Sequence, residues 1–169
     1  QGSRMGFDEI LLKNQDGRNQ QATALLETQE QKEAEVQVSE TDRFLSIQSD
    51  TFFYVYNKLS GLFEQLSVDG EELLETPMEL NIWRAPTDND RKIKQEWIDA
   101  GYDRSKARAY DTHWEMNGEG IRIYSTVSVA AVAIQKVLDI EAVWKIYRTG
   151  EISVKMHVKK DREFPQLPR

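Results

Sequence analysis

The sequence lacks cysteine entirely and contains no long run of apolar residues. Without cysteine the chain forms no disulfide and performs no thiol chemistry, which fits a reducing cytoplasm. No apolar stretch approaches the ~18 residues that a membrane-spanning helix requires, and no signal peptide is visible at the N-terminus. We therefore expect a cytoplasmic chain with no membrane partner.

Positive charge is also in short supply. The chain has 22 lysines and arginines against 29 aspartates and glutamates, which gives a net charge of −7. This balance argues against nucleic acid and anionic membranes as partners. The sequence also contains neither a phosphate-binding glycine loop nor a G-x-S-x-G nucleophile motif.

Histidine occurs only twice, as His113 and His157. The two lie on different predicted strands with no cysteine near either, whereas zinc requires three or four ligands. We therefore expect no metal site, and we interpret both histidines as solvent-facing or partly packed side chains.

The length of 169 residues fits one domain, or one domain with a piece of another. Gln1 to Arg4 resembles a protease-site and cloning remnant. Short strands are predicted over Phe7 to Leu12 and over Ala22 to Glu27. The polar stretch from Gln29 to Glu35 has no apolar stripe and is interpreted as a linker. We expect residues 1–40 to be separate from a domain over residues 41–169.

Short runs rich in aromatic and β-branched residues indicate strands in the second segment. They alternate with turn signals such as Asp69-Gly70, Asn117-Gly118 and Thr149-Gly150. A short helix is predicted over Lys92 to Ala100, ended by Gly101. The predicted strands are Phe44–Gln48, Phe52–Asn57, Leu62–Val68, Ala107–Glu115, Ile121–Ala131, Gln135–Tyr147 and Glu151–Lys159. The pattern predicts an all-β chain with antiparallel, half-buried sheets.

The segment Asn81 to Asp90, with the sequence NIWRAPTDND, combines residue types that core packing alone does not require. Trp83 offers a flat apolar face that can stack on a sugar or fill a core. Arg84 carries a rigid five-donor guanidinium. Asp88, Asn89 and Asp90 can bond to neighbouring backbone amides and hold a loop in one shape.

The stretch WRAPTDND resembles a signature of the bacterial β-galactosidases of glycoside hydrolase family 2. Further similar stretches in the same order are YNKLSGLFEQLSVDGEELL (Tyr56 to Leu74), AGYDR (Ala100 to Arg104) and FPQLPR (Phe164 to Arg169). The resemblance covers about Val38 to Arg169, and Gly6 to Thr28 matches weakly the end of the preceding immunoglobulin-like domain.

The resemblance implies an antiparallel β-sandwich of the supersandwich, galactose mutarotase-like type, truncated at its C-terminus. It further implies that the chain is part of a longer parent enzyme that hydrolyses terminal β-D-galactosyl residues, as in lactose, in the bacterial cytoplasm. Its catalytic glutamates lie on a separate barrel domain of the same chain, so no catalytic residue is assigned here and this fragment alone is expected to be inactive. The resemblance also implies Mg²⁺ or Na⁺ for the parent, with no cofactor on this fragment.

By the same resemblance, the loop from Asp90 to about Gln95 borders the mouth of the active site. Some family members have a glycine soon after the Asp-Asn-Asp run, whereas Arg91 and Lys92 follow it here, which makes this rim more basic. The residues proposed to lie at the substrate rim or to contact carbohydrate are Trp83, Arg84, Asp88, Asn89 and Asp90.

Other interpretations of these residues remain open from the sequence. Asp88 and Asp90 could form an acid/base pair or hold a divalent cation, but we favour a turn acceptor for Asp88 and an ion pair of Asp90 with Arg84 or Arg91. Trp83 more often packs beside Pro86 than binds sugar.

Two other functions are also open: a stand-alone carbohydrate-binding module, or a purely structural, oligomerising sandwich. If the sandwich is incomplete, one apolar sheet face is uncovered, which predicts a homo-oligomer or coverage by the N-terminal segment.

Overall fold

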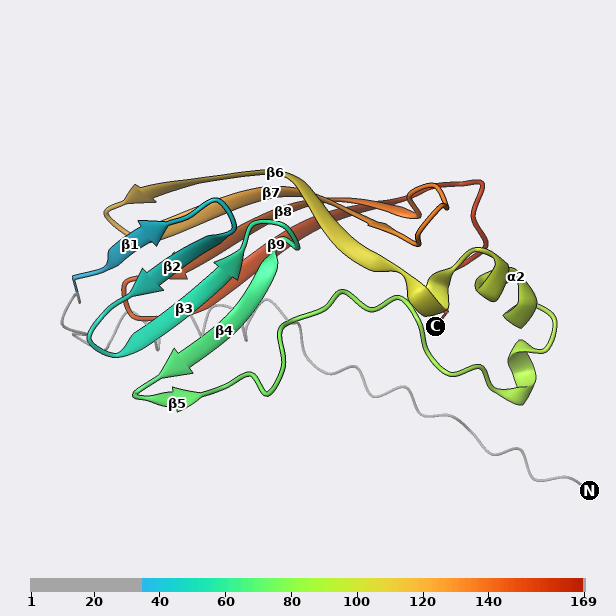
Figure 1. Cartoon of the computed structure of the whole chain (residues 1–169), viewed down its shortest axis with the longest axis horizontal. Helices are drawn as coiled ribbons and strands as arrows, with labels where there is room; N and C mark the ends of the chain where they lie inside the picture. Colours follow the sequence, from blue (N-terminus) through green and yellow to red (C-terminus); the bar gives the residue numbers. More distant parts are fainter. Residues whose placement is uncertain (1–34, 169) are drawn as a thin grey trace, which may run out of the picture. The chain divides into compact units, whose positions relative to one another are not determined.

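The computed structural model describes residues 35–168, which form two antiparallel sheets (Figure 1). The predicted strands over Phe7–Leu12 and Ala22–Glu27 lie outside the described residues, as does most of the linker. Described helices are short, and none of them is long and apolar enough to cross a membrane. The prediction of an all-β antiparallel sandwich is confirmed.

The first sheet is a meander in which each strand pairs with the next along the chain. A strand at Gln37–Glu40, within the residues 1–40 that were expected to be separate from the domain, pairs with the following strand, so the sheet begins before residue 41. The division of the chain into two domains stays a prediction. The strands are β1 (Gln37–Glu40), β2 (Phe44–Gln48), β3 (Phe52–Asn57), β4 (Leu62–Val68) and β5 (Glu71–Glu72).

The second sheet is also a meander, with longer strands. Its members are β6 (Lys106–Asn117), β7 (Gly120–Ala130), β8 (Leu138–Tyr147) and β9 (Ile152–Lys160). The prediction that β8 begins at Gln135 is wrong by three residues. A turn follows β7 in which Ala133 has a φ of 62°, and β8 starts only after it.

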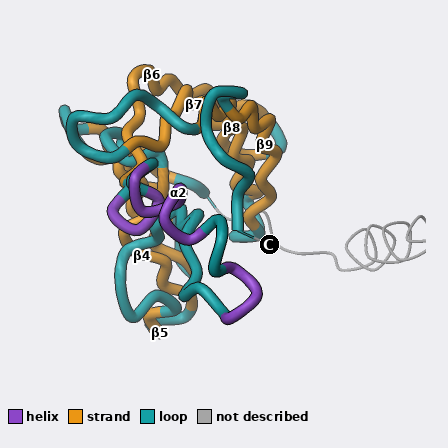
Figure 2. Tube along the Cα trace, turned by 90° about the vertical axis from the view of Figure 1, so that its right-hand side faces the viewer, coloured by secondary structure: helices purple, strands orange, loops and turns teal. Residues whose placement is uncertain are grey.

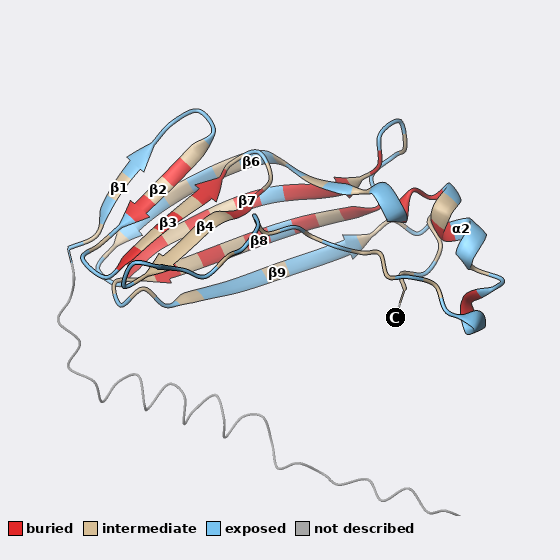
Figure 3. Cartoon of the chain, turned by 60° about the horizontal axis from the view of Figure 1, so that its bottom comes forward, coloured by how far each residue is buried: buried red, intermediate tan, exposed pale blue. Residues whose placement is uncertain are grey.

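Alternate residues of the two sheets face each other and form the core (Figure 3). Tyr56 and Phe63 of the first sheet pack edge-on against Trp144 of β8, with ring centroids 6.5 and 5.2 Å away. The Tyr56 hydroxyl lies 2.8 Å from Ser125 Oγ on β7, which adds a buried hydrogen bond between the sheets. Burial raises the pKa of Tyr56 to about 12, so the phenol stays protonated and able to donate.

The connection between the sheets contains three short helical segments, η1 (Asp88–Asp90), α2 (Lys94–Asp99) and η2 (Tyr102–Arg104). Figures 1 and 2 show them beyond the strand ends, at the end of the sheets where β6 begins. The predicted helix over Lys92 to Ala100 is confirmed with slightly narrower bounds. Gly101, at a φ of 75°, follows it, as the sequence predicted.

Candidate functional site

The candidate site is built around an ion pair between Arg84 and Asp90. Arg84 Nη1 donates to Asp90 Oδ2 at 2.7 Å, and Arg84 Nη2 donates to Oδ1 at 3.0 Å. Asp90 Oδ2 also accepts bonds from the backbone amide and the hydroxyl of Thr87, at 2.7 and 2.9 Å. The Asp90 carboxylate thus binds both the Arg84 guanidinium and Thr87, and so holds the loop from Arg84 to Asp90 together.

The electrostatics of the pair follow from these bonds. The hydrogen bonds from Arg84 and from the Thr87 amide hold the pKa of Asp90 well below its usual range. The bond to Asp90 in turn raises the pKa of Arg84. Asp90 is therefore ionised at any ordinary working pH. A carboxylate in this state cannot store the proton that a general acid must supply.

Two tryptophans connect the loop to α2. The rings of Trp83 and Trp97 meet edge to face, with centroids 6.4 Å apart and an interplanar angle of 85°. The Arg84 guanidinium lies over the Trp97 ring, 5.6 Å from its centroid. Trp97 is buried and Trp83 is half-buried. Trp97 thus connects α2 to the loop.

The segment after β9 completes the cluster. Trp97 Nε1 donates to the carbonyl of Gln166 at 2.7 Å, and the Tyr102 hydroxyl donates to the carbonyl of Pro165 at 2.7 Å. Lys160 Nζ donates to the carbonyl of Phe164, also at 2.7 Å. Burial raises the pKa of Tyr102 to about 12, so this donor keeps its proton. The chain near residues 164–168 is thus tied to α2 and η2.

Three segments of the sequence signature therefore meet in space, although they are separated along the chain. WRAPTDND supplies Trp83, Arg84 and Asp90, AGYDR supplies Tyr102, and FPQLPR supplies the accepting carbonyls. Sequence reasoning named these segments but missed the donor roles of Trp97, Tyr102 and Lys160. Only the aromatic character of the first two hinted at them.

A depression of about 320 Å³ lies beside the ion pair. Of the proposed rim residues, Trp83 and Arg84 line this depression. Asp90 does not line it but is bonded to Arg84. Asp88 and Asn89 are exposed on η1 and do not line it. The lining residues are Asn81, Ile82, Trp83, Arg84, Leu167 and Pro168.

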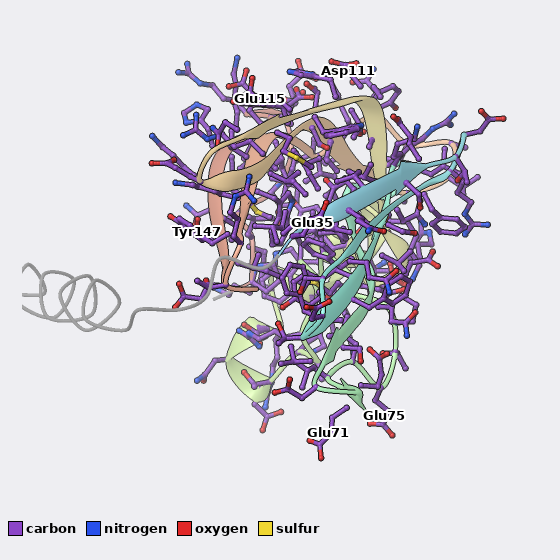
Figure 4. The ribbon with its side chains drawn as sticks, turned by 90° about the vertical axis from the view of Figure 1, so that its left-hand side faces the viewer. Glu35, Glu71, Glu75, Asp111, Glu115 and Tyr147 are labelled. Atoms are coloured by element: carbon purple, nitrogen blue, oxygen red, sulfur yellow. The ribbon has the colours of Figure 1, made fainter. Side chains whose placement is uncertain are left out.

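Other chemical groups lie apart from this cluster. His113 is exposed on β6, stacked on Tyr124 with ring centroids 4.8 Å apart, and His157 is exposed on β9. Figure 4 shows Asp111 and Glu115 on one side of the view, and Glu71 and Glu75 on the opposite side. Within residues 35–168 no group of three or more histidines, aspartates or glutamates is arranged to hold a metal ion.

The remaining tryptophans are structural. Trp144 is buried in the core. Trp114 is half-buried on β6, and its Nε1 donates to Glu40 Oε2 of β1 at 2.9 Å. This bond adds another polar link between the sheets, beside the one from Tyr56.

The fold and the cluster define a β-sandwich domain in which a signature loop is held rigidly at one end of the sheets. The family model for the β-galactosidase small chain matches residues 48–169, and the chain belongs to this family. Over 133 residues the chain is 31% identical to a β-galactosidase from Actinobacillus pleuropneumoniae, covering 79% of this chain and 13% of that relative.

Two further relatives give the same result. A β-galactosidase from Staphylococcus xylosus is 28% identical over 168 residues, covering 98% of this chain and 16% of the relative. One from Pseudoalteromonas haloplanktis is 29% identical over 150 residues, covering 79% of this chain and 14% of the relative. The chain therefore spans about one seventh of the length of these curated relatives.

Proposed function

We propose that this chain is a non-catalytic scaffold portion of a glycoside hydrolase family 2 β-galactosidase. The parent enzyme hydrolyses terminal β-D-galactosyl residues of lactose-type substrates. The catalytic barrel domain of the same enzyme is the proposed partner of the sandwich. Membership of the small-chain family and the names of the relatives support this assignment.

The bonding of Asp90 is the observation that carries the proposal. Retaining and inverting glycosidases need two carboxyl groups, one of which holds a proton. Asp90 is the most buried carboxylate of the signature loop, yet Arg84 and Thr87 occupy its oxygens and lower its pKa. It is therefore suited to fixing a loop and unsuited to donating a proton.

In this proposal the fixed loop has a mechanical role. The ion pair between Arg84 and Asp90 fixes the position of the chain at η1. The contacts of Trp97 fix its position at α2. The intervening residues 90–95 then form a rim of defined shape at the substrate site. A rim held in one position restricts where a galactoside can bind, which contributes to orientation without contact with the reacting bond.

The first test uses the purified chain and a chromogenic β-galactoside. No turnover is expected. Hydrolysis that disappears in Asp88→Ala or Asp90→Ala would place the chemistry here and overturn the proposal.

The second test uses the complete natural reading frame. Asp90→Ala is expected to lower kcat/KM through misplacement of the rim. Asp50→Ala, at an exposed turn between β2 and β3, serves as the matched control and should leave activity unchanged. Equal kcat/KM values for the two variants would contradict the proposed role of Asp90 in positioning the rim.

A second function, direct carbohydrate contact, is favoured by the depression beside Trp83 and Arg84. A half-buried indole next to polar groups is a common sugar platform. Titration with galactose or lactose should then quench tryptophan fluorescence in a saturable way. The response should be lost in Trp83→Ala and kept in Trp114→Phe; its absence from the unsubstituted chain would contradict sugar contact.

A further inference from the structure

The glycine that follows α2 packs directly against the turn between β7 and β8, which lies at the same end of the sheets (Figure 1). A Cβ added at Gly101 would lie 2.5 Å from Ala131 Cβ and 2.9 Å from Ile134 Cδ1. Its φ of +75° is one that residues with side chains rarely adopt. Gly101 and Ala131 are both buried. Only glycine therefore fits at this contact between the helical connection and the second sheet.

The second sheet holds its side of the contact in place. Ala131 directly follows β7, and across the turn Val137 N–H donates to the carbonyl of Val129 at 2.8 Å. Ile134 N–H donates to the Ala131 carbonyl at 3.1 Å, and Ala133 between them has a φ of 62°. An alanine keeps such a conformation only where its surroundings impose it. The Ala131 Cβ is bonded directly to this backbone and cannot rotate away.

The other side of the contact is connected to the rim by backbone hydrogen bonds. Gly101 N–H donates to the carbonyl of Ile98 at 3.0 Å, and Trp97 N–H donates to that of Ile93 at 3.1 Å. Ile93 N–H in turn donates to the carbonyl of Asp90 at 3.0 Å. The six residues of α2 span about 9 Å. A displacement of Gly101 is thus transmitted along one short helix to the rim.

The size of such a displacement follows from the contact distance. Carbon atoms in contact lie about 3.5–4.0 Å apart. A Cβ at position 101, only 2.5 Å from Ala131 Cβ, therefore requires a movement of at least about 1 Å. Because the sheet holds Ala131, α2 is the part that moves. A misplacement of about 1 Å can lower an enzymatic rate about a hundredfold.

We propose that Gly101 and Ala131 are positioning residues for the β-galactosidase reaction, and that their contact sets the position of the rim relative to the bound galactoside. In this proposal neither residue contacts substrate, and both act through α2. The proposal rests on the proposed function of the rim. It extends that function to the turn between β7 and β8, which lies outside the segments of the sequence signature.

The structural part of the proposal is tested on the purified chain by NMR. Gly101→Ala is expected to change the amide chemical shifts of residues 91–95 and the indole N–H signal of Trp97. Ala131→Gly, added to Gly101→Ala, removes the closest contact. It is expected to return these signals at least about halfway to their original positions, because the remaining contact is with the flexible end of Ile134.

Gly150→Ala is the matched control. Gly150 also has a positive φ, of +89°, and an added Cβ would lie 2.9 Å from Phe52 Cδ1. It belongs to the turn between β8 and β9, at the opposite end of the second sheet from Ala131. Gly150→Ala therefore introduces backbone strain and a clash, and it should leave the signals of the rim unchanged.

The functional part is tested in the complete natural reading frame with a chromogenic β-galactoside. Gly101→Ala is expected to lower kcat/KM at least about tenfold, in part through a rise in KM of at least about threefold. A smaller fraction of folded enzyme would lower kcat and leave KM unchanged, so KM distinguishes a displaced rim from instability. Gly150→Ala should keep the KM of the unsubstituted enzyme, and Ala131→Gly should recover part of the loss in Gly101→Ala.

Ala131→Val tests the same contact from the side of β7. It leaves position 101 as glycine and so adds bulk without strain at a left-handed backbone. KM is expected to rise in this variant too, which keeps the proposal testable if Gly101→Ala does not fold.

Several results would overturn the proposal and leave the proposed function standing. They are unchanged rim signals in Gly101→Ala, a KM in an active enzyme that neither Gly101→Ala nor Ala131→Val changes, and a loss that Ala131→Gly does not reverse. The last result would assign the effect to strain at position 101 alone. A complete enzyme that hydrolyses no galactoside before any substitution would instead overturn the proposed function, and this inference with it.

Discussion

Gly61 tests whether the two sheets pack as closely as the structure shows. It lies between β3 and β4 with a φ of +75°, and an added Cβ would lie 2.5 Å from Val127 Cγ2 on β7. Val127 is buried and has a short side chain that cannot swing aside. For Gly61→Ala the left-handed backbone costs about 1–2 kcal/mol. Overpacking adds about 1–3 kcal/mol, so the free energy of unfolding is expected to fall by about 2–5 kcal/mol in total.

Gly70 is the matched control. Its φ is +83°, but an added Cβ would meet no atom within 4 Å. Gly70→Ala therefore carries only the backbone cost of about 1–2 kcal/mol. Equilibrium unfolding in urea, followed by tryptophan fluorescence, gives both free energies of unfolding. Val127→Ala in the Gly61→Ala background should lose less stability than the sum of the two single changes.

The expected signature is a larger loss for Gly61→Ala than for Gly70→Ala. Equal losses in the two variants would refute the reasoning, because they would show that no clash with the second sheet occurs. Additivity of the Gly61 and Val127 changes would lead to the same conclusion.

Two further predictions concern the polar links. Tyr56→Phe removes the bond to Ser125 and should lower the free energy of unfolding by about 1 kcal/mol in the same urea assay; no change would mean that the bond contributes nothing net. The lowered pKa of Asp90 contributes stability that is fully present above its unfolded pKa of about 4 and is lost as pH falls below it. In Asp90→Asn this pH-dependent contribution to stability should be absent when urea midpoints are measured down to about pH 2. If the urea midpoint of the variant depended on pH as steeply as that of the unsubstituted chain, the stabilising role of the Arg84–Asp90 ion pair would be contradicted.

The sequence alone indicated the strands of the second sheet, apart from the start of β8. Side chains alternate along a strand with a period of two, so the repeat Ile152, Val154, Met156, Val158 indicated both the strand and its inner face. The bond between Arg84 and Asp90 was also foreseeable, because six residues separate the partners and a turn can bring them together. The antiparallel, all-β class followed from the same local patterns.

Local patterns could not reveal everything, because short elements carry few residues. β1 and β5 contain four and two residues and were not predicted. The start of β8 was missed because Ala133 adopts a left-handed conformation that its residue type does not signal.

Only the tertiary structure decided which distant groups meet. Trp97 and Gln166 are separated by 69 positions, as are Tyr56 and Ser125. Whether an apolar strand face is covered also depends on how far the opposite sheet extends, so the sequence marks Val154 as inward-facing while the fold leaves it exposed. The alternation of apolar residues along a strand and the residue types of turns depend on near neighbours in the sequence. The docking of sheets and loops depends instead on the packing of surfaces that form only when the chain folds.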